Sequence, residues 1–249
     1  MLTAERRQAI LTRLERDGKV VASELVASLG VSEDTVRRDL RELAAGGHVL
    51  RVHGGALPPP PAPASFAQRL SVAPEAKAHL AAAALPLLEG AKVLVLDGGT
   101  TALELARRLP PERACTVLTN SPPVAVALAS HPRADVVLIG GRLLKDSQVT
   151  VGAAAIDALR QVRADACVLG VCSLHPELGV SATDHDEAHV KRAMVAASAE
   201  VIALATADKL RTAGPWVVAP LADVTHLVTD AGADLTDAYA AAGVSVVRA

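Results

Sequence analysis

Residues 23–43 read SELVASLGVSEDTVRRDLREL, and this stretch decides how the N-terminal part of the chain folds. Apolar residues recur in it at helical spacing on both sides of Gly30, a residue type that permits a tight turn. The two apolar stripes consist of Leu25, Val26 and Leu29, and of Val36, Leu40, Leu43 and Ala44. Ser23 and Ser32 stand where helix N-caps are expected. The pattern predicts two short helices joined by a tight turn.

The flanking residues extend this pattern in both directions. An earlier apolar stripe at helical spacing is interrupted at Gly18, and Gly46-Gly47 ends the last helix. The earlier stripe consists of Ile10, Leu11 and Leu14. After it, His48–Val52 alternates like a short strand and is closed by Gly54-Gly55. Three short helices followed by a pair of strands are typical of a winged helix-turn-helix.

The third predicted helix has an exposed face that suits DNA. Because its apolar stripe faces inward, the opposite face carries Asp34, Thr35, Arg37, Arg38 and Arg41. Arginine can bond guanine through two parallel hydrogen bonds, and serine or threonine hydroxyls can reach phosphates. Arg51 and His53 lie in the predicted wing, within reach of the DNA backbone or minor groove. A solvated amphipathic helix would look similar, but the preceding helix, the glycine turn and the wing favour a recognition helix for double-stranded operator DNA.

The composition limits the classes of function. Of the 249 residues, 51% are hydrophobic and 21% are charged, as in a folded globular protein. Phe66, Trp216 and Tyr239 are the only aromatic residues, which argues against a base-stacking platform for single-stranded nucleic acid. Residues 1–55 carry nine basic and eight acidic side chains, and the remainder carries 16 and 19. DNA binding therefore needs charge placed on one face rather than bulk charge.

A proline-rich segment divides the chain. Pro58–Pro61 are four consecutive prolines, and Pro63 follows closely. Such a run favours a stiff, extended conformation that continues neither a helix nor a central strand. We predict a winged helix-turn-helix domain over residues 1–57, a proline-rich linker over residues 58–65, and an α/β domain over residues 66–249.

In the α/β domain short apolar runs alternate with helical patterns. The runs are Val93–Leu96, Thr116–Leu118, Val136–Ile139, Cys167–Leu169, Val201–Ala205, His226–Val228 and Val244–Val247. The helical patterns include Thr101–Leu109, Ala153–Val162, Glu187–Ala197 and Asp234–Ala242. This alternation predicts a mostly parallel sheet that helices cover on both faces. Ligands of such sheets bind at the carboxyl ends of the strands.

The first of these strands ends in a sequence that suits an anion, Asp97-Gly98-Gly99-Thr100-Thr101. The glycines let backbone N–H groups approach an anion, the hydroxyls add donors, and the N-terminus of the following helix adds a partial positive charge. No P-loop motif occurs, and a purely structural turn would look the same. Asp97 can cap this turn or bind a hydroxyl of the ligand.

Further residues at strand ends and on the next helix are expected to converge on the same effector site. They are Asn120, Gly140, Gly141, Arg142, Gly152, Gly170, Ser173, Asp184, Glu187, Lys191 and Lys209. For Lys209 we favour contact with a phosphate over an ion pair, whereas Arg142 is as readily a solvated side chain. His185 and His189 lie near acidic residues, but acidic residues suit the start of a helix. We therefore expect neither a metal ion nor a cofactor.

The DNA-facing motifs carry a family resemblance. VSEDTVRRDL (residues 31–40), followed by RVHGGA (residues 51–56), closely resembles the DeoR family of sugar-metabolism repressors. The resemblance runs from about Glu5 to Asp230. It implies that the second domain has the fold shared by ribose-5-phosphate isomerase and CoA transferases, and that its effector is a phosphorylated sugar or a related metabolite. It also implies DNA contacts by Ser32, Thr35, Arg37, Arg38 and Arg41.

The chain departs from the family pattern at two strand ends. Thr206 stands where an aspartate is usual, three residues before Lys209, and Cys172-Ser173-Leu174 replaces a small residue followed by Ser-Gly. The alternative function is a sugar-phosphate isomerase-like enzyme with an attached DNA-binding module. Isomerisation needs a general base, and Gly170–Ser173 contains neither Asp nor Glu, so we expect no enzyme.

Together these features predict a transcriptional repressor of a sugar or carbohydrate operon, controlled by a phosphorylated effector. One winged helix makes few base contacts, so we expect a homodimer or homotetramer assembled through the α/β domain. Cys115, Cys167 and Cys172 are expected to be buried thiols in a reducing compartment. Neither a signal peptide nor a long apolar stretch is evident, so we expect a cytoplasmic protein without a membrane partner.

Overall fold

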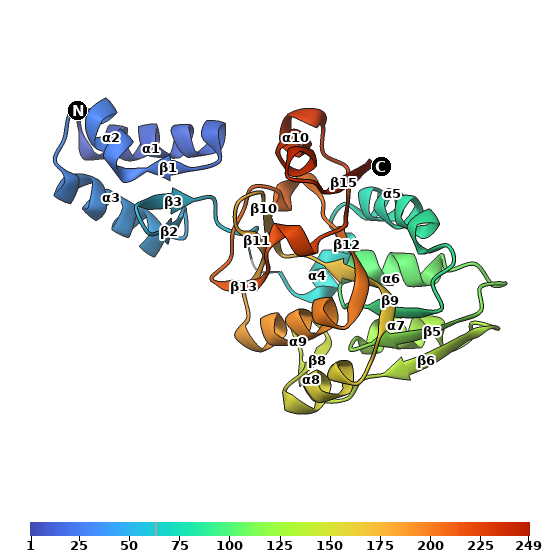
Figure 1. Cartoon of the computed structure of the whole chain (residues 1–249). Helices are drawn as coiled ribbons and strands as arrows, with labels where there is room; N and C mark the ends of the chain where they lie inside the picture. The colour runs from blue at the N-terminus through green and yellow to red at the C-terminus, as the bar shows by residue number, and fades with distance from the viewer. Residues whose placement is uncertain (63) are drawn as a thin grey trace.

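The computed structural model describes residues 1–62 and 64–249, and Pro63 of the predicted linker lies outside them. Figure 1 shows a small N-terminal body joined to a larger α/β body. We call the small body the DNA head and the larger one the sensor body. The elements of the DNA head are α1 (Thr3–Asp17), β1 (Val20–Val21), α2 (Ala22–Leu29), α3 (Glu33–Ala45), β2 (Leu50–Val52) and β3 (Gly55–Leu57).

The DNA head has its own core and turns. Its core contains Ile10, Leu25 and Val36, and its three strands pair antiparallel in the order β1-β3-β2. Gly30 ends α2 in the left-handed region, at φ +65°, which a glycine adopts without a steric penalty. The hydroxyl of Ser32 accepts a hydrogen bond from the Thr35 backbone N–H at 3.3 Å, so it caps α3 as predicted.

The predicted N-cap at Ser23 is wrong. Helix α2 begins at Ala22, and its N-cap is Val21. Val21 is also the last residue of β1 and pairs with Gly55 of β3. Because the chain turns from the strand directly into the helix, Ser23 already lies inside the first turn. The two-residue strand was too short to be recognised from its apolar pattern.

A seven-stranded parallel sheet forms the centre of the sensor body. In spatial order its strands are β15 (Ser245–Arg248), β14 (His226–Thr229), β12 (Ser198–Leu204), β9 (Ala164–Gly170), β4 (Val93–Leu96), β5 (Cys115–Thr119) and β6 (Ala134–Leu138). All six neighbouring pairs are parallel. Each apolar run that we predicted as a strand overlaps one of these seven strands, so the predicted fold class is confirmed.

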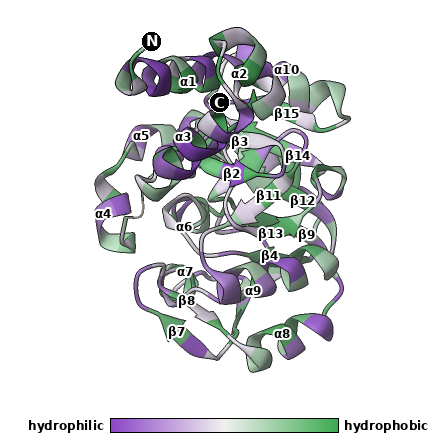
Figure 2. Cartoon of the chain, turned by 90° about the vertical axis from the view of Figure 1, so that its left-hand side faces the viewer, coloured by the Kyte–Doolittle hydropathy of each residue, from purple (hydrophilic) through white to green (hydrophobic). Residues whose placement is uncertain are grey.

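Helices cover both faces of this sheet (Figure 1). One face packs against α5 (Pro74–Ala84), α6 (Thr100–Arg107) and α7 (Pro122–Leu128). The other packs against α8 (Ala153–Arg160), α9 (His185–Ala196) and α10 (Ala233–Ala241). Side chains alternate between the two cores, as Leu94 and Val95 do on β4. In Figure 2 hydrophilic residues are prominent on α3, while the strands of the central sheet are mainly hydrophobic.

Shorter elements surround one end of the sheet. They are α4 (Phe66–Ser71), the hairpin β7 (Arg142–Leu144) and β8 (Val149–Val151), and a small antiparallel sheet of β10 (Ser173–His175), β11 (Gly179–Ala182) and β13 (Trp216–Ala219). Three 3-10 helices complete the described elements: η1 (Leu85–Leu88), η2 (Ala207–Lys209) and η3 (Leu221–Asp223). Within residues 1–62 and 64–249, no helix combines the length and apolarity that crossing a bilayer requires.

The strand order places a topological switch point between β4 and β9. From β4 the chain moves outward through β5 to one edge of the sheet, and from β9 it moves through β12 to the other edge. The connections therefore diverge at the carboxyl ends of these two central strands. In open parallel sheets this switch point leaves a crevice that binds ligands.

Candidate DNA-binding face and effector pocket

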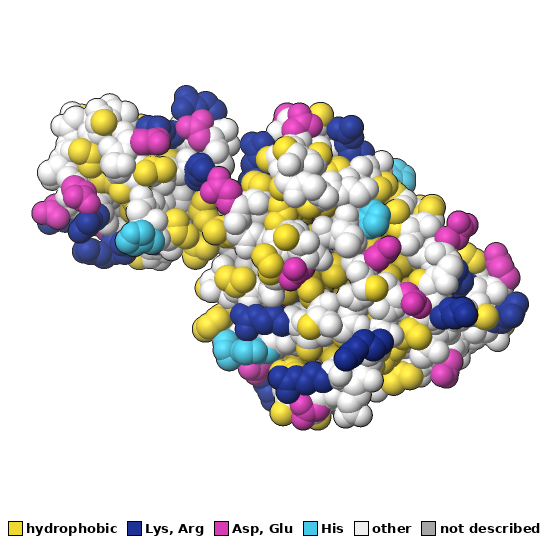
Figure 3. Space-filling view, in the orientation of Figure 1, with side chains coloured by type: hydrophobic (Ala, Val, Ile, Leu, Met, Phe, Trp, Pro, Cys, Tyr) yellow, Lys and Arg dark blue, Asp and Glu magenta, His cyan; other side chains and the backbone are white. Residues whose placement is uncertain are grey.

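Helix α3 presents three arginines to solvent. Arg37, Arg38 and Arg41 are all exposed, and Figure 3 shows basic side chains gathered at this end of the DNA head. Arg37 forms an ion pair with Glu33 at 2.6 Å. Among the described residues, no ion pair involves Arg38 or Arg41. Their charges are available to a polyanion.

The other predicted DNA contacts lie on neighbouring elements. The hydroxyls of Ser32 and Thr35 are 2.9 Å apart at the N-terminus of α3, where backbone N–H groups can meet a phosphate. Arg51 is exposed on β2, and His53 is exposed in the turn between β2 and β3. The helix, its N-terminus and the wing therefore all offer exposed polar groups.

A buried carboxylate that the sequence analysis missed holds α3 against α1. Asp39 is 1% exposed and accepts hydrogen bonds from Arg6 and from the Nε–H of Arg7, the latter at 3.1 Å. Burial alone would raise the pKa of Asp39, but the hydrogen bonds from both guanidinium groups outweigh burial and hold that pKa below its usual value. The ion pairs fix the orientation of α3 while its opposite face stays free.

In the sensor body a hollow opens at the carboxyl ends of β4 and β9. It has an inner lobe of about 320 Å³ and an outer lobe of about 310 Å³ that share part of their walls. These volumes lie at the lower end of the range for small-molecule sites. Predicted effector residues that line it are Gly98, Gly99, Thr100, Thr101, Gly170, Asp184, Glu187, Lys191 and Lys209. We call this hollow the effector pocket.

A buried ion pair lies beneath the effector pocket: Lys191 lines the inner lobe, whereas Asp97, which was also predicted to contact the effector, is not among the lining residues. The ammonium of Lys191 contacts the Asp97 carboxylate and donates to the Gly170 carbonyl oxygen at 2.8 Å. Asp97 also accepts from the Gly170 N–H at 3.0 Å, and its other carboxylate oxygen is buried without a hydrogen-bond partner. Asp97 is 1% exposed and Lys191 3%. The pair therefore joins the ends of β4 and β9 to α9, and it leaves one carboxylate oxygen of Asp97 without a hydrogen bond.

Two carboxylates keep Lys191 charged. Glu187 lies one helical turn before it on α9, with its carboxylate 3.3 Å from the Lys191 Nζ. Burial alone would lower the pKa of Lys191, but the charges of Asp97 and Glu187 outweigh burial and raise that pKa. Lys191 is thus a permanent ammonium in this pocket.

Two glycines are required by close packing beside this pair. A Cβ on Gly98 would lie 2.0 Å from a methyl group of Val149, and a Cβ on Gly170 would lie 2.7 Å from the carbonyl oxygen of Gly98. Any side chain at either position would force the loops apart. The glycines allow β4, β8 and β9 to meet closely enough to form the pocket.

A group of three basic residues lies on the other side of the pocket, and only Lys209 of these was predicted from the sequence. Arg69 of α4 and Lys77 of α5 join Lys209 in the lining of the inner lobe. Lys77 is 6% exposed and donates only to the backbone carbonyl oxygens of Arg69 and Val72. The Nε–H of Arg69 is buried without a partner. Within the described residues none of the three forms an ion pair.

The positive charge of each of these residues makes it less favourable for its neighbours to stay protonated. Burial lowers the pKa of Lys77, and the nearby charges of Lys209 and Arg69 lower it further. Burial likewise lowers the pKa of Lys209, while Cys172 and Asp208 act to raise it and Arg69 and Lys191 to lower it. Partly buried positive charge with no carboxylate at ion-pair distance favours binding of an anion. We call Arg69, Lys77 and Lys209 the cationic group.

The remaining predicted effector residues lie outside the lining of the pocket. Asn120 is 1% exposed and donates to the Thr150 carbonyl oxygen at 3.0 Å, and the buried Ser173 hydroxyl has no partner. Arg142 is exposed and pairs with Asp186. The glycines in this set are Gly140, Gly141 and Gly152, which flank the β7–β8 hairpin. These residues shape the loops around the pocket rather than its surface.

Both departures from the family pattern lie in the pocket. Thr206 and Cys172 line the inner lobe, and Asp208 lines it next to Lys209. Burial raises the pKa of the Cys172 thiol, so it stays protonated and is a poor nucleophile. Both residues therefore contribute to the shape and polarity of the pocket beside the cationic group.

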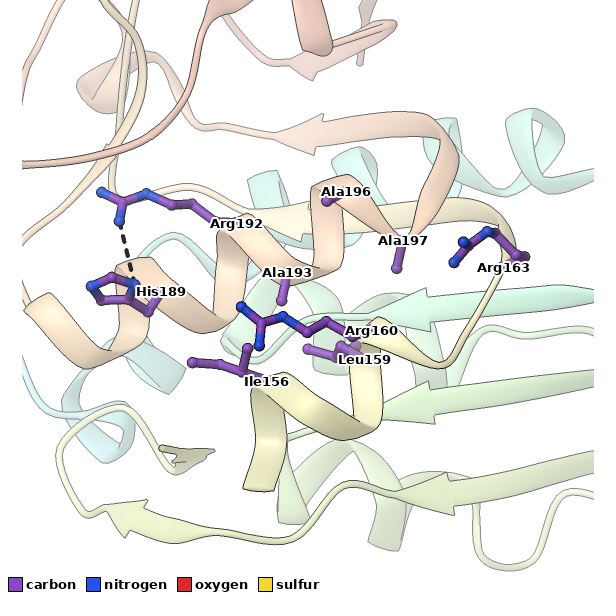
Figure 4. A pocket seen from close by; sticks show the side chains of 9 residues that line it. All are labelled: Ile156, Leu159, Arg160, Arg163, His189, Arg192, Ala193, Ala196 and Ala197. Atoms are coloured by element: carbon purple, nitrogen blue, oxygen red, sulfur yellow. Dashed lines mark hydrogen bonds between the residues drawn. The ribbon is translucent and has the colours of Figure 1, made fainter. Parts of the chain in front are cut away.

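A separate hollow lies between α8 and α9. Figure 4 shows Ile156 and Leu159 of α8 below Ala193 of α9, with the Arg160 side chain between them and Arg192 above. None of the predicted effector residues lines this hollow. It is distinct from the switch point of the sheet.

The histidines weighed for a metal site lie near this hollow. The Nε2 atoms of His185 and His189 are 3.2 Å apart, and the His185 ring meets Trp216 edge-on. Asp184 instead caps α9 by accepting from the Glu187 N–H at 2.8 Å. Among the described residues, no group of three or more His, Cys, Asp and Glu side chains is arranged to hold a metal ion.

The chain is similar to known proteins along both bodies. The family model of the DeoR-like helix-turn-helix domain matches residues 6–59, and that of the DeoR C-terminal sensor domain matches residues 72–231. The HTH-type transcriptional regulator GlpR of Haloferax volcanii is 34% identical over 99% of this chain and 98% of its own length. A putative aga operon transcriptional repressor of Escherichia coli O157:H7 is 31% identical over 98% of this chain and 93% of its own length.

A third regulator and a solved structure are also similar to the chain. The HTH-type transcriptional repressor GlcR of Bacillus subtilis is 31% identical over 92% of this chain and 89% of its own length. Ribose 5-phosphate isomerase A of Methanocaldococcus jannaschii is a partial structural neighbour, with a TM-score of 0.38 and 15% identity over 53% of this chain and 52% of that one. Because the sensor-domain model covers more than half of the sequence and the curated relatives span nearly all of it, the chain belongs to the DeoR family of helix-turn-helix transcriptional regulators.

Proposed function

We propose that this chain represses a carbohydrate operon by binding operator DNA through α3 and the wing, and that a phosphorylated sugar in the effector pocket controls this binding. The proposal that a phosphorylated sugar binds in the pocket rests on one observation, which is that two features suited to anions lie together. The Gly98–Thr101 loop at the N-terminus of α6 and the cationic group line the same pocket. The names of the repressors that resemble the chain support the regulatory half.

In this proposal the two sides of the pocket bind different parts of the effector. The cationic group and the Gly98–Thr101 loop bind the phosphate. The Glu187 carboxylate, which lines the pocket, and the unpaired oxygen of Asp97, which is buried beneath the pocket, accept hydrogen bonds from sugar hydroxyls. A ligand with both a phosphate and hydroxyl groups therefore satisfies more of the pocket than inorganic phosphate does.

We further propose a homodimer or homotetramer in the cytoplasm, assembled through the α/β domain of residues 66–249. One winged helix makes few base contacts, so two or more heads increase both affinity and specificity. Strand β6 is an edge of the sheet on which Val137 is 42% and Leu138 50% exposed, which supports a contact with a second copy. Light scattering on the purified chain measures its mass directly, and a monomer at micromolar concentration would contradict this proposal.

The effector half is tested by thermal unfolding of the full chain with pentose, hexose and glycerol phosphates and with their unphosphorylated parents. A ligand present at 100 times its dissociation constant stabilises by about 2.7 kcal/mol. We expect stabilisation only by phosphorylated compounds, and its loss in the Thr100→Val, Lys209→Ala double variant. Lys92→Ala is the matched control, because Lys92 is exposed just before the amino end of β4. Equal shifts with the unphosphorylated parents would refute the assignment.

The regulatory half is tested with duplexes that the chain selects from a random library. We expect Arg38→Ala to weaken binding of a selected duplex and to leave the effector-induced thermal shift unchanged. We propose that the pocket binds its ligand without turnover, since Glu187, which lines it, and Asp97 beneath it both face the ammonium of Lys191. An assay for isomerisation of pentose and hexose phosphates checks this, and measurable turnover would favour the isomerase-like alternative.

A further inference from the structure

One short segment connects the effector pocket to the DNA head. Residues 206–213 leave the carboxyl end of β12 and include η2. At the start of the segment, Thr206, Asp208 and Lys209 line the effector pocket. We call these residues the coupling segment.

The other end of the coupling segment touches the DNA head and the linker. A Cβ built on Gly18, at the end of α1, would lie 3.4 Å from the Cδ of Arg211, so the Arg211 side chain lies against the head. The Ala213 N–H donates to the Pro58 carbonyl oxygen at 3.2 Å. Only one residue separates Lys209 in the pocket from Arg211 at the head.

The middle of the coupling segment is held in a strained conformation by a buried tyrosine. Arg211 has φ +58°, which is unusual for a residue with a side chain. The Tyr239 hydroxyl accepts from the Arg211 N–H at 2.9 Å and donates to the Leu174 carbonyl oxygen of β10 at 2.7 Å. Tyr239 is fully buried, and burial raises its pKa to about 12, so the hydroxyl keeps its proton. One hydroxyl therefore ties the segment to the β10–β11 hairpin.

That hairpin makes a second connection between the same two places. It begins just after the pocket residues Gly170 and Cys172 and ends just before Asp184. At its tip, the Glu177 carboxylate pairs with the Lys19 ammonium of the DNA head at 2.5 Å. An exposed pair of this kind adds little energy by itself, but it fixes where the head meets the hairpin.

We infer that the coupling segment, fixed to β10 by the Tyr239 hydroxyl, transmits occupancy of the effector pocket to the position of the DNA head. An anion bound to Lys209 contacts the segment at the pocket, and the DNA head contacts the segment at Arg211. The inference rests on the proposed function for the pocket and for the head. Linkage then requires DNA and effector to change each other's affinity by the same factor.

The test uses the full chain, a duplex that it selects, inorganic phosphate and the sugar phosphate that gives the largest thermal shift. For each variant, the coupling factor is the ratio of duplex dissociation constants with and without ligand. We expect a factor of about five or more in the wild type, within the usual range for allosteric proteins. Tyr239→Phe keeps the ring and removes the hydroxyl, and Arg211→Ala removes the contact with Gly18 together with the hydrogen bond from Arg211 to the Asp234 carbonyl oxygen. We expect both variants to bring the factor close to one while binding each ligand alone as the wild type does.

Thr225→Val is the matched control for loss of a bridging hydroxyl. The Thr225 hydroxyl accepts from the Val201 N–H at 3.0 Å and donates to the Val201 carbonyl oxygen at 2.9 Å, away from the pocket and the head. We expect this variant to keep the wild-type factor. If Tyr239→Phe does not fold, Arg211→Ala decides.

Three results would overturn the inference. They are a wild-type factor of one, full coupling in Arg211→Ala and in any folded Tyr239→Phe, and an equal loss of coupling in Thr225→Val. The thermal shift separates these results from failure of the proposed function. A coupling factor of one together with a clear thermal shift would refute the inference but leave the pocket assignment intact. If no phosphate compound shifts the melting temperature, the pocket assignment is refuted as well.

Discussion

The two bodies of this chain present their functional charges in opposite ways. On the DNA head, Arg38 and Arg41 are exposed, while a separate buried ion pair at Asp39 supports the fold. In the sensor body, Lys191 lines the pocket and also supports the fold through its buried ion pair with Asp97. In the head, the residues available for recognition differ from those that stabilise the fold, whereas in the sensor body the same ion pair contributes to both. Substitutions in the two bodies should therefore have different consequences.

The largest expected effect is that of Lys191→Met on stability. This change leaves the Asp97 carboxylate buried without its cation, which typically costs about 3–5 kcal/mol. For a chain of this size we expect the melting temperature to fall by roughly 10 °C. Thermal denaturation followed by circular dichroism measures this shift.

Arg160→Ala is the control for Lys191→Met. Arg160 pairs with Asp157 at 3.2 Å, but both side chains are well exposed. We expect a change within about 0.5 kcal/mol. If Lys191→Met melted no lower than Arg160→Ala, the sensor body would not combine stability with recognition as we argue.

The sequence predicted much of this arrangement where the signal was local. The Gly98–Thr101 loop could be placed because a continuous apolar strand precedes it and a helical pattern follows it. The carboxyl ends of parallel strands meet at one edge, so Gly170 and Lys209 were expected near that loop, and all of them line the same pocket. The outward face of α3 followed from the periodicity of its apolar residues.

Pairings between distant residues could not be predicted in the same way. Asp97 and Lys191 are 94 positions apart, and Asp39 and Arg6 are 33 apart. Lys77 and Arg69 were missed because they lie on helices that precede β4, the first strand of the seven-stranded sheet, rather than at strand ends. No local pattern indicated that α4 and α5 close one side of the pocket. Arg142 stood after a predicted strand, but the β7–β8 hairpin directs it to Asp186.

The next effect in size is that of Arg38→Ala on DNA binding. A good contact of an arginine with a base is worth about 1–3 kcal/mol, which corresponds to roughly 5- to 150-fold in affinity. We expect a loss in this range in fluorescence anisotropy at fixed salt. The melting temperature should not change, since Arg38 is exposed and no described ion pair involves it.

Arg37→Ala sharpens this comparison within the same helix. Arg37 is already paired with Glu33 at 2.6 Å, so part of its charge is neutralised before DNA arrives. We expect a smaller loss of affinity than for Arg38→Ala. Equal losses would mean that the ion pair opens at little cost when DNA binds.

The smallest effect is a dependence of anion binding on pH through Lys209. Burial, aided by Arg69 and Lys191, holds the pKa of Lys209 below its ordinary value of 10.5. An anion prefers the protonated ammonium, so affinity for a sugar phosphate should fall as pH rises through this lowered pKa. Isothermal titration above pH 7.5 isolates the effect, since phosphate monoesters lose their second proton near pH ~6.

The ligand-free chain should respond to the same titration with the opposite sign. Because Lys209 has a lower pKa in the folded than in the unfolded chain, the folded state binds fewer protons in the window between that pKa and 10.5. The contribution of Lys209 to stability must therefore increase with pH there, while affinity for the anion decreases. Lys209→Arg keeps its charge throughout and should lose both trends. If affinity fell with pH equally in this variant, another group of the pocket, such as Lys77, would be responsible for the titration.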